Sequence, residues 1–233
     1  LLTKKVDNID MVIVEGDTSS TFAAALAAFY NRISIGHVEA GLRTWDKYAP
    51  YPEEINRKLT TALADIHFAP TPLNRENLLA EGISDRDIKV TGNTVIDALM
   101  MVRDMIRNEA KEFEQLSGID FSRRIVLVTG HRRENFGKGF VNLCNALKDI
   151  AVMNRDVDIV YPVHLNPNVR KPVESILSGI DNVKLLDPLE YEPFVSILDR
   201  SYFVITDSGG IQEEAPFLGK PVLVTRDKTE RPE

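Results

Sequence analysis

A glycine pair near the end of the 233-residue chain provides the residue types of a phosphate-binding turn. The apolar run at residues 203–206 leads into Asp207, Ser208, Gly209 and Gly210, and a helical pattern begins at once. Glycines let a backbone approach a ligand closely, a serine hydroxyl can cap a helix, and free N–H groups of a first helical turn attract anions. The alternative interpretation is an ordinary tight turn between a strand and a helix.

An acidic residue in the same helical pattern suggests which kind of anion the turn would hold. Glu214 stands about two helical turns beyond Ser208. There its carboxylate can accept hydrogen bonds from the two hydroxyl groups of a ribose. The turn and the carboxylate together suggest a nucleotide.

Polar side chains also follow other apolar runs of the chain. Ligands of parallel α/β sheets gather at the carboxyl ends of the strands, so residues just beyond each run are candidates for chemistry. We single out Asp17, Glu39, His131 and His164 for this reason.

These positions and two neighbouring glutamates also have structural explanations. Asp17 could cap the helix that starts at Thr18. Glu53 and Glu54 could be first-turn residues of a helix, stabilised by its dipole, and this explanation holds for at least one of them. Glu39 is harder to explain in this way, because an unpaired carboxylate at a buried strand end is costly unless it has a partner or a role.

His131 shares a glycine turn with Arg132 and Arg133, which favours anion binding over a packing role for its ring. The two arginines could equally pair with Glu134 or with nearby surface carboxylates.

Several kinds of catalytic and cofactor site have no matching motif in the sequence. It contains no HExxH, GxSxG, Walker or GxGxxG motif, and Cys144 is the only cysteine. A cysteine metal cluster, covalent catalysis and a nicotinamide cofactor are therefore disfavoured, and we expect no cofactor and no metal. Carboxylates facing a nucleotide-diphosphate turn instead suit proton transfer on a nucleotide sugar.

Composition is typical of a soluble globular protein, with 43% apolar and 27% charged residues. The longest apolar run, residues 22–30, is far shorter than the ~18 residues of a membrane span, so we expect no membrane partner. A single cysteine suits a reducing compartment, and the cytoplasm is the expected location. The net charge of -7 argues against nucleic acid as a partner.

Apolar runs alternate with helical patterns along the chain, which predicts βαβ units, parallel sheets and an α/β fold. The expected strands are residues 9–14, 33–38, 66–69, 88–91, 125–129, 159–161, 183–186, 203–206 and 222–225. The expected helices are residues 20–30, 94–116, 138–153, 169–177, 191–198 and 209–218. We predict the remainder of an N-terminal Rossmann-like domain at residues 1–93, a connecting helix at 94–118 and a C-terminal UDP-binding Rossmann-like domain at 119–233.

Eight motifs, in order, resemble the non-hydrolysing UDP-N-acetylglucosamine 2-epimerases, from about residue 9 to the last residue. They are EGDT (15–18), GHVEAGLRT (36–44), YPEEINR (51–57), TGN (91–93), TGHRREN (129–135), YPVHLNPNV (161–169), DSGGIQEEAP (207–216) and TERPE (229–233). Eight ordered motifs make the match specific, whereas DSGG alone is weak. Hydrolysing 2-epimerases carry a different sequence in place of GHVEAGLRT and rank lower.

The resemblance implies a GT-B-like pair of Rossmann-like domains with the substrate cleft between them, and a homodimer. It implies reversible C2 epimerisation of UDP-N-acetylglucosamine to UDP-N-acetylmannosamine, by anti elimination of UDP, a 2-acetamidoglucal intermediate and re-addition. The product would supply N-acetylmannosamine-type sugars for cell-envelope polysaccharide.

The resemblance also implies roles for individual residues. Its catalytic residues are Asp17, Glu39, Glu53 and His131, the last beside the diphosphate of departing UDP. Its substrate-binding residues are Phe194 and the Leu189 backbone at the uracil, Ser208, Gly209 and Gly210 at phosphate, Glu214 at ribose, and Arg231 near the substrate. Arg132 and His164 match a pocket in which a second UDP-N-acetylglucosamine activates bacterial members, so allosteric activation is a hypothesis.

The chain begins at Leu1, stops at Glu233 and has no counterpart of the family's first strand and glycine turn or of its closing helices, so we expect truncation at both ends. Three alternatives remain open. A UDP-sugar-dependent glycosyltransferase of GT-B fold would need an acceptor, a hydrolysing 2-epimerase would release UDP, and a sugar-nucleotide sensor would bind without turnover.

Overall fold

The computed structural model describes residues 9–132 and 136–233 and divides into two compact units. The first unit comprises the described part of Leu1–Thr94 together with Lys228–Glu233, and the second comprises the described part of Val95–Asp227. Each is a parallel α/β unit, and each is considered by itself below. Among the described residues, no helix combines the length and the apolarity needed to cross a membrane.

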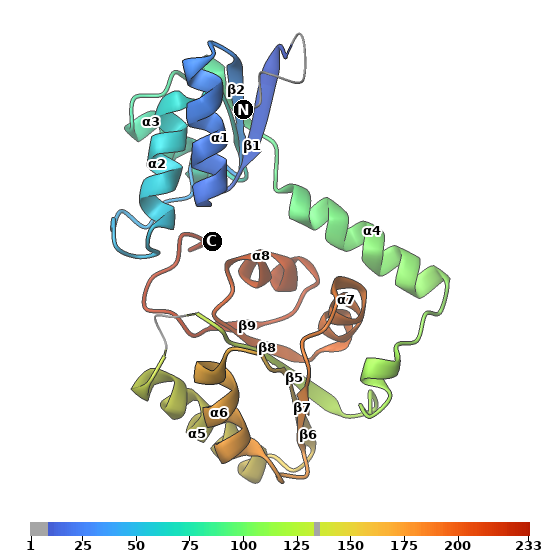
Figure 1. Cartoon of the computed structure of the whole chain (residues 1–233). Helices are drawn as coiled ribbons and strands as arrows, with labels where there is room; N and C mark the ends of the chain where they lie inside the picture. The colour runs from blue at the N-terminus through green and yellow to red at the C-terminus, as the bar shows by residue number, and fades with distance from the viewer. Residues whose placement is uncertain (1–8, 133–135) are drawn as a thin grey trace. The chain divides into compact units, whose positions relative to one another are not determined.

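The first unit is built on a four-stranded parallel sheet in the order β1-β2-β3-β4. Its strands are β1 (Met11–Glu15), β2 (Ser34–Val38), β3 (Ile66–Ala69) and β4 (Ile88–Val90). Its helices are α1 (Ser19–Tyr30), α2 (Glu53–Leu63) and α3 (Pro72–Ala80), and α1 and α2 pack against one another (Figure 1). Because the strands are parallel, their carboxyl ends meet at one edge of the sheet.

Local sequence explains where two helices of the first unit, α1 and α3, begin. The Thr18 hydroxyl accepts a hydrogen bond from the backbone N–H of Thr21 and caps α1. Thr71 and Asn74 form a reciprocal capping box at the start of α3, with Pro72 at its first position. A small core forms between α1 and the first two strands, and a second one forms between α3 and the last two.

The second unit contains a five-stranded parallel sheet in the order β7-β6-β5-β8-β9. Its strands are β5 (Arg124–Thr129), β6 (Val157–Pro162), β7 (Val183–Leu186), β8 (Phe203–Thr206) and β9 (Val222–Val224). The first strand of this unit, β5, lies between β6 and β8, so the chain winds outward from β5 in both directions. Loops after β5 and β8 therefore flank the topological switch point, where doubly wound sheets bind ligands.

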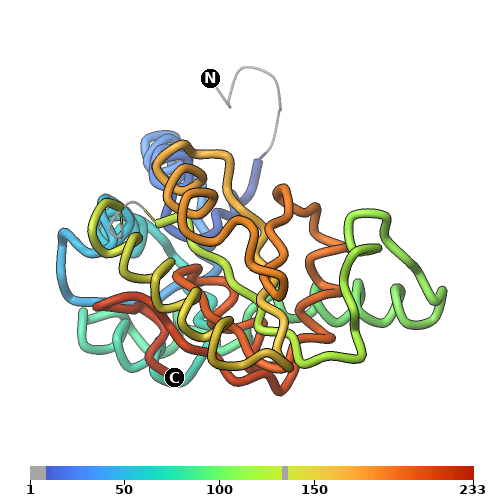
Figure 2. The backbone as a smooth tube through the Cα atoms, turned by 90° about the horizontal axis from the view of Figure 1, so that it is seen from below, coloured from blue at the N-terminus to red at the C-terminus, as the bar shows by residue number. Residues whose placement is uncertain are grey.

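Helices cover both faces of the five-stranded sheet (Figure 1). Helices α5 (Lys138–Met153) and α6 (Pro167–Leu177) pack side by side on one face, as Figure 2 also shows. Helices α7 (Tyr191–Arg200) and α8 (Gly209–Phe217) lie on the other face with α4 (Thr94–Asn108), which buries Leu99 and Ile106 there. Coverage of both faces accounts for the continuous apolar runs of these strands.

The structure confirms the α/β fold class with parallel sheets, and every predicted strand is present within a few residues. The predicted helix at 94–116 is too long: α4 ends at Asn108, and a separate short 3₁₀ helix, η3 (Glu114–Leu116), follows. Lys228–Glu233 belongs with the first unit, although it follows the last strand of the second. The predicted domain boundaries stay a prediction.

Gly41 provides a test of how closely α3 approaches the loop after β2. Its φ is +89°, and a Cβ atom there would lie 2.3 Å from the backbone oxygen of Asn74. We expect Gly41→Ala to lower the free energy of unfolding by about 3–4 kcal/mol, as measured by urea denaturation. Gly82 has a φ of +88°, and its added Cβ would meet no described atom within 4 Å. Gly82→Ala should cost only about 1–2 kcal/mol, and equal costs for the two variants would contradict the clash.

Candidate active site

Asp207 joins the two loops at the switch point of the second unit. It follows β8 directly and is fully buried. Its carboxylate accepts backbone hydrogen bonds from His131, at 3.0 Å, and from Arg132, at 2.9 Å. The hydroxyl groups of Thr129 and Thr206 lie 2.6 Å apart just before the two loops. The loop that carries His131 is therefore fixed to the start of the glycine turn.

The glycine turn differs in detail from the expectation. Ser208 is the N-cap residue of α8, but its side chain makes no capping hydrogen bond to the described first turn, so the predicted hydroxyl cap is wrong. Its backbone N–H donates instead to the Thr206 hydroxyl at 2.9 Å. A Cβ atom on Gly210 would meet no described atom within 4 Å. Packing therefore does not require this glycine, and space is left beside the first turn of α8.

The side chain of His131 is partly exposed beside this turn. Its ring stacks on that of His164, with centroids 5.7 Å apart and an angle of 17° between the planes. Burial lowers the pKa of His131, the charges of Arg132 and His164 lower it further, and the carboxylate of Asp207 opposes them. At neutral pH the ring is therefore mainly neutral, with one N–H to donate.

Glu214 is 4% exposed on α8, and the Tyr191 hydroxyl donates a hydrogen bond to its Oε1 at 2.9 Å. Burial raises the pKa of Glu214, while this hydrogen bond opposes the rise. Leu189 and Phe194 are partly buried against the core beneath α7. The second unit thus contains every predicted nucleotide-binding residue except Arg231.

Asp17 and Glu39 lie together at the strand ends of the first unit. Asp17 follows β1, and Glu39 follows β2 with a left-handed backbone of φ +64°. Both carboxylates contact Nη2 of Arg57 on α2: Asp17 Oδ2 makes a short ion pair, and Glu39 Oε2 lies 3.6 Å away. Positive φ is strained for a glutamate, and such strain concentrates at functional sites.

Arg231 belongs to this same group of side chains. Its Nη2 lies 2.6 Å from Glu39 Oε1, and its Nη1 pairs with Glu230. Nδ2 of Asn93, from the TGN motif, lies 3.4 Å from the same Glu39 oxygen. The predicted substrate residue Arg231 is therefore an ion-pair partner of a predicted catalytic carboxylate.

The two glutamates that start α2 have different surroundings. Glu54 is fully buried, and its carboxylate accepts backbone hydrogen bonds from Thr44 and Trp45 at 3.0 and 3.1 Å. Its role is structural. Within the described residues, Oε2 of Glu53 is buried without a hydrogen-bond partner, and Glu53 stands one helical turn before Arg57. Of the two glutamates, Glu53 is therefore the one whose carboxyl group keeps an oxygen without a described partner.

Sequence reasoning missed the roles of Arg57 and Asp207. Each joins residues that are far apart in the chain, so no local motif shows the pairing. The signal for Arg57 is its spacing of four from Glu53, which places both on one face of α2. For Asp207, the signal is an acidic residue directly after a continuous apolar strand.

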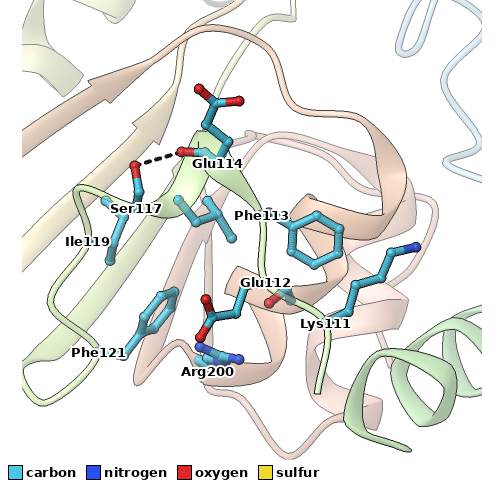
Figure 3. Close-up of a pocket in the computed structure, with 10 residues that line it drawn as sticks. Lys111, Glu112, Phe113, Glu114, Ser117, Ile119, Phe121 and Arg200 are labelled. Carbon is cyan, nitrogen blue, oxygen red and sulfur yellow. Dashed lines mark hydrogen bonds between the residues drawn. The ribbon is translucent and has the colours of Figure 1, made fainter. Parts of the chain in front are cut away.

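A cavity of about 400 Å³ in the second unit is distinct from these residues. Figure 3 shows side chains that line it, among them Phe113, Phe121, Lys111 and Arg200. None of the predicted site residues lines it. The described residues also contain no group of three or more His, Cys, Asp or Glu side chains that could hold a metal ion.

Two Rossmann-like units with parallel sheets place the chain in the GT-B-like α/β class. A sequence profile described as UDP-N-acetylglucosamine 2-epimerase matches residues 3–233. The chain belongs to the UDP-N-acetylglucosamine 2-epimerase family.

Several relatives are similar along nearly the whole chain. UDP-N-acetylglucosamine 2-epimerases of Escherichia coli K12 and Campylobacter jejuni are 58% and 54% identical to it. These matches cover 96% of this chain and 61% and 60% of the relatives, so the chain spans about three fifths of their length.

Two solved structures share the fold and were determined with nucleotide-sugar ligands. The Neisseria meningitidis 2-epimerase bound to UDP-GlcNAc has a TM-score of 0.92 and 50% identity, covering 96% of this chain and 61% of that one. The Methanocaldococcus jannaschii enzyme in complex with UDP-GlcNAc and UDP has a TM-score of 0.81 and 34% identity, covering 99% and 63%.

Glu214 should make the stability of the protein depend on pH. Because its folded-state pKa is raised, ionisation favours the unfolded state as pH rises above about 4.3, its unfolded value. We expect Glu214→Gln to match the wild type below that pH and to be more stable, by about 1 kcal/mol, at pH 8. Thermal unfolding at several pH values tests this. A constant difference between the two proteins would contradict it.

Proposed function

We propose that the full protein interconverts UDP-N-acetylglucosamine and UDP-N-acetylmannosamine without net loss of UDP. Family membership supports 2-epimerase activity, and the paired carboxylates of the first unit support a reaction built on proton transfer. The observation that carries the proposal is that Asp17 and Glu39 share one buried cation while both stay partly exposed, at 20% and 17%.

The chemistry explains why several acid/base groups are needed. The proton on C2 is not adjacent to a carbonyl group, so its simple removal would leave an unstabilised carbanion. In an anti elimination, a carboxylate takes the C2 proton while the C1–O bond breaks and UDP leaves with the bonding pair. The intermediate is 2-acetamidoglucal. Delivery of a proton to the other face of C2, and return of the UDP oxygen to C1, gives the epimer.

In this proposal, the first unit supplies the proton-transfer groups. Asp17 and Glu39 are both held by contacts with Nη2 of Arg57, and each has a carboxylate that can accept a proton. Glu53 lacks such a cation among the described residues, and its unpartnered buried oxygen suits a group that carries a proton for part of the cycle. The assignment of each carboxylate to a face of the sugar stays open.

The second unit supplies the nucleotide contacts in this proposal. Ser208, Gly209 and Gly210 would hold phosphate with the first N–H groups of α8. Glu214 would accept from the ribose hydroxyls, and Phe194 with the Leu189 backbone would contact the uracil. Neutral His131 would donate a hydrogen bond to the diphosphate as charge develops on departing UDP. Arg231 would meet the substrate beside Glu39.

Incubation of the full protein with UDP-N-acetylglucosamine in deuterated water tests the function directly. Deuterium at C2, with UDP-N-acetylmannosamine formed and no lasting release of UDP, is the expected result. Free N-acetylmannosamine with UDP would identify a hydrolysing 2-epimerase. An unchanged C2 would overturn the proposal and favour the glycosyltransferase or the sensor, which UDP release on addition of acceptor sugars would separate.

Asp17→Asn tests the role of the carboxylates. The amide keeps the size of the side chain but cannot accept the C2 proton, so we expect kcat to fall at least about 1,000-fold with little change in UDP affinity. Asp65→Asn is a matched control, because Asp65 of the same unit accepts a structural hydrogen bond from the backbone of Ile35 at 2.8 Å. It should lower the melting temperature and leave kcat within about 3-fold. Loss of UDP binding in Asp17→Asn would indicate a binding role instead.

We also propose that a second UDP-N-acetylglucosamine activates the enzyme at Arg132 and His164. Support comes from the stacking of His164 on His131 and from the backbone bond of Arg132 to Asp207, which bring both residues to the diphosphate end of the second unit. Turnover of UDP-N-acetylmannosamine should then need a trace of the other sugar nucleotide. Full turnover without it would contradict activation.

The homodimer, the cytoplasmic location and the supply of envelope polysaccharide stay predictions.

A further inference from the structure

Arg57 contacts the carboxylates of Asp17 and Glu39 from the buried side. It is 1% exposed, whereas Asp17 and Glu39 retain 20% and 17% of their side-chain surface. A group this deeply buried cannot meet a substrate directly. Any effect of Arg57 on the reaction must therefore pass through the carboxylates it holds.

The hydrogen bonding of Arg57 differs from that of a buried arginine with a structural role. Arg43, in the same unit, is 4% exposed and donates through Nε and Nη2 to Glu81, at 2.9 and 2.6 Å, and through Nη1 to the Leu42 carbonyl. Arg57 directs Nη2 to both carboxylates, and within the described residues its Nε and Nη1 atoms have no partner. The position of the Arg57 side chain therefore satisfies its two contacts with carboxylates and leaves Nε and Nη1 without described hydrogen-bond partners.

Asp17 depends on this cation more than Glu39 does. Among the described residues, Arg57 is the only cation paired with Asp17, whereas Glu39 also has Arg231 at 2.6 Å. Glu230 shares the charge of Arg231. Asn56 adds a bond from its amide to the Asp17 backbone carbonyl at 3.0 Å, which fixes the loop without adding charge.

His37 on β2 lies beneath the same loops and adds no charge of its own. Its Nε2 lies 2.9 Å from the Gly16 carbonyl, which can only accept, so Nε2 carries the proton. Burial lowers the pKa of His37 to about 4, and the charges of Arg57, His67 and Arg43 add to this effect. The His37 ring is therefore neutral near neutral pH. Of His37 and Arg57, only Arg57 places a positive charge below Asp17.

We infer that Arg57 is a positioning residue for the epimerase reaction, which holds the carboxylates of Asp17 and Glu39 at a fixed separation without contacting the substrate. The inference rests on the proposed function. According to the inference, Arg57 sets the relative placement of Asp17 and Glu39, the two groups that would exchange the C2 proton. Its guanidinium also provides the positive charge that both carboxylates contact.

Arg57→Met and Arg57→Lys test this in the full protein, with kcat and KM measured by C2 exchange and UDP affinity measured separately. Arg57→Met removes the group that both carboxylates contact, so their relative placement is lost and kcat should fall about 100-fold. KM and UDP affinity should change little. Arg57→Lys keeps a charge but not the forked geometry, so it should recover only part of kcat.

Arg43→Met is the matched control, since it removes an equally buried arginine that contacts neither carboxylate. It should lower the melting temperature and leave kcat within about 3-fold of the wild-type value. A wild-type kcat in Arg57→Met, while the wild type exchanges deuterium, would contradict the inference and leave the proposed function intact. If Arg57→Met does not fold, an Arg57→Lys enzyme with wild-type kcat would also overturn it. A wild-type protein without exchange would overturn both.

Discussion

The site of the first unit depends on one interaction, the contact of the Arg57 guanidinium with the carboxylates of Asp17 and Glu39. Parallel strands bring their carboxyl ends to one edge of the sheet, so residues that follow neighbouring strands lie close together even where their charges repel. Asp17 and Glu39 lie together in this way, and two carboxylates at close range repel one another. The guanidinium that α2 inserts beneath them resolves the conflict while leaving part of each carboxylate exposed. The position of α2 therefore determines the chemistry available at the strand ends.

The second unit handles a strand-end carboxylate differently. Asp207 is completely buried, and its carboxylate accepts hydrogen bonds from the backbone N–H groups of His131 and Arg132. Backbone donors fix geometry without bringing a mobile positive charge. The partly exposed positive and polar groups of this loop can therefore face a ligand while the buried carboxylate maintains the loop. The two units use the same edge of a parallel sheet, one for proton transfer and one for anion binding in the proposed function.

The sequence was sufficient to predict those features that depend on neighbouring residues. Continuous apolar runs predicted every strand, and the position of Glu39 directly after one predicted its place at a strand end. Features set by tertiary packing could not be found in this way. Whether Glu53 or Glu54 was structural depended on which carboxylate reaches the backbone of Thr44 and Trp45. The end of α4 at Asn108 and the return of Lys228–Glu233 to the first unit likewise have no local signal.

Several unfavourable local features of the chain lie on the groups assigned to chemistry, although Arg32, Trp45 and Ala110 also have left-handed backbones. Glu39 has a left-handed backbone, a conformation that costs about 1–3 kcal/mol for a residue of this kind. Glu214 is an acid whose ionised form is disfavoured by burial, and Arg57 leaves two buried donors without described partners. Selection for stability alone would remove each of these costs, since apolar or better-satisfied residues would serve the fold. Their presence on residues proposed to hold the nucleotide and to place the proton-transfer groups is what a site maintained for function should show.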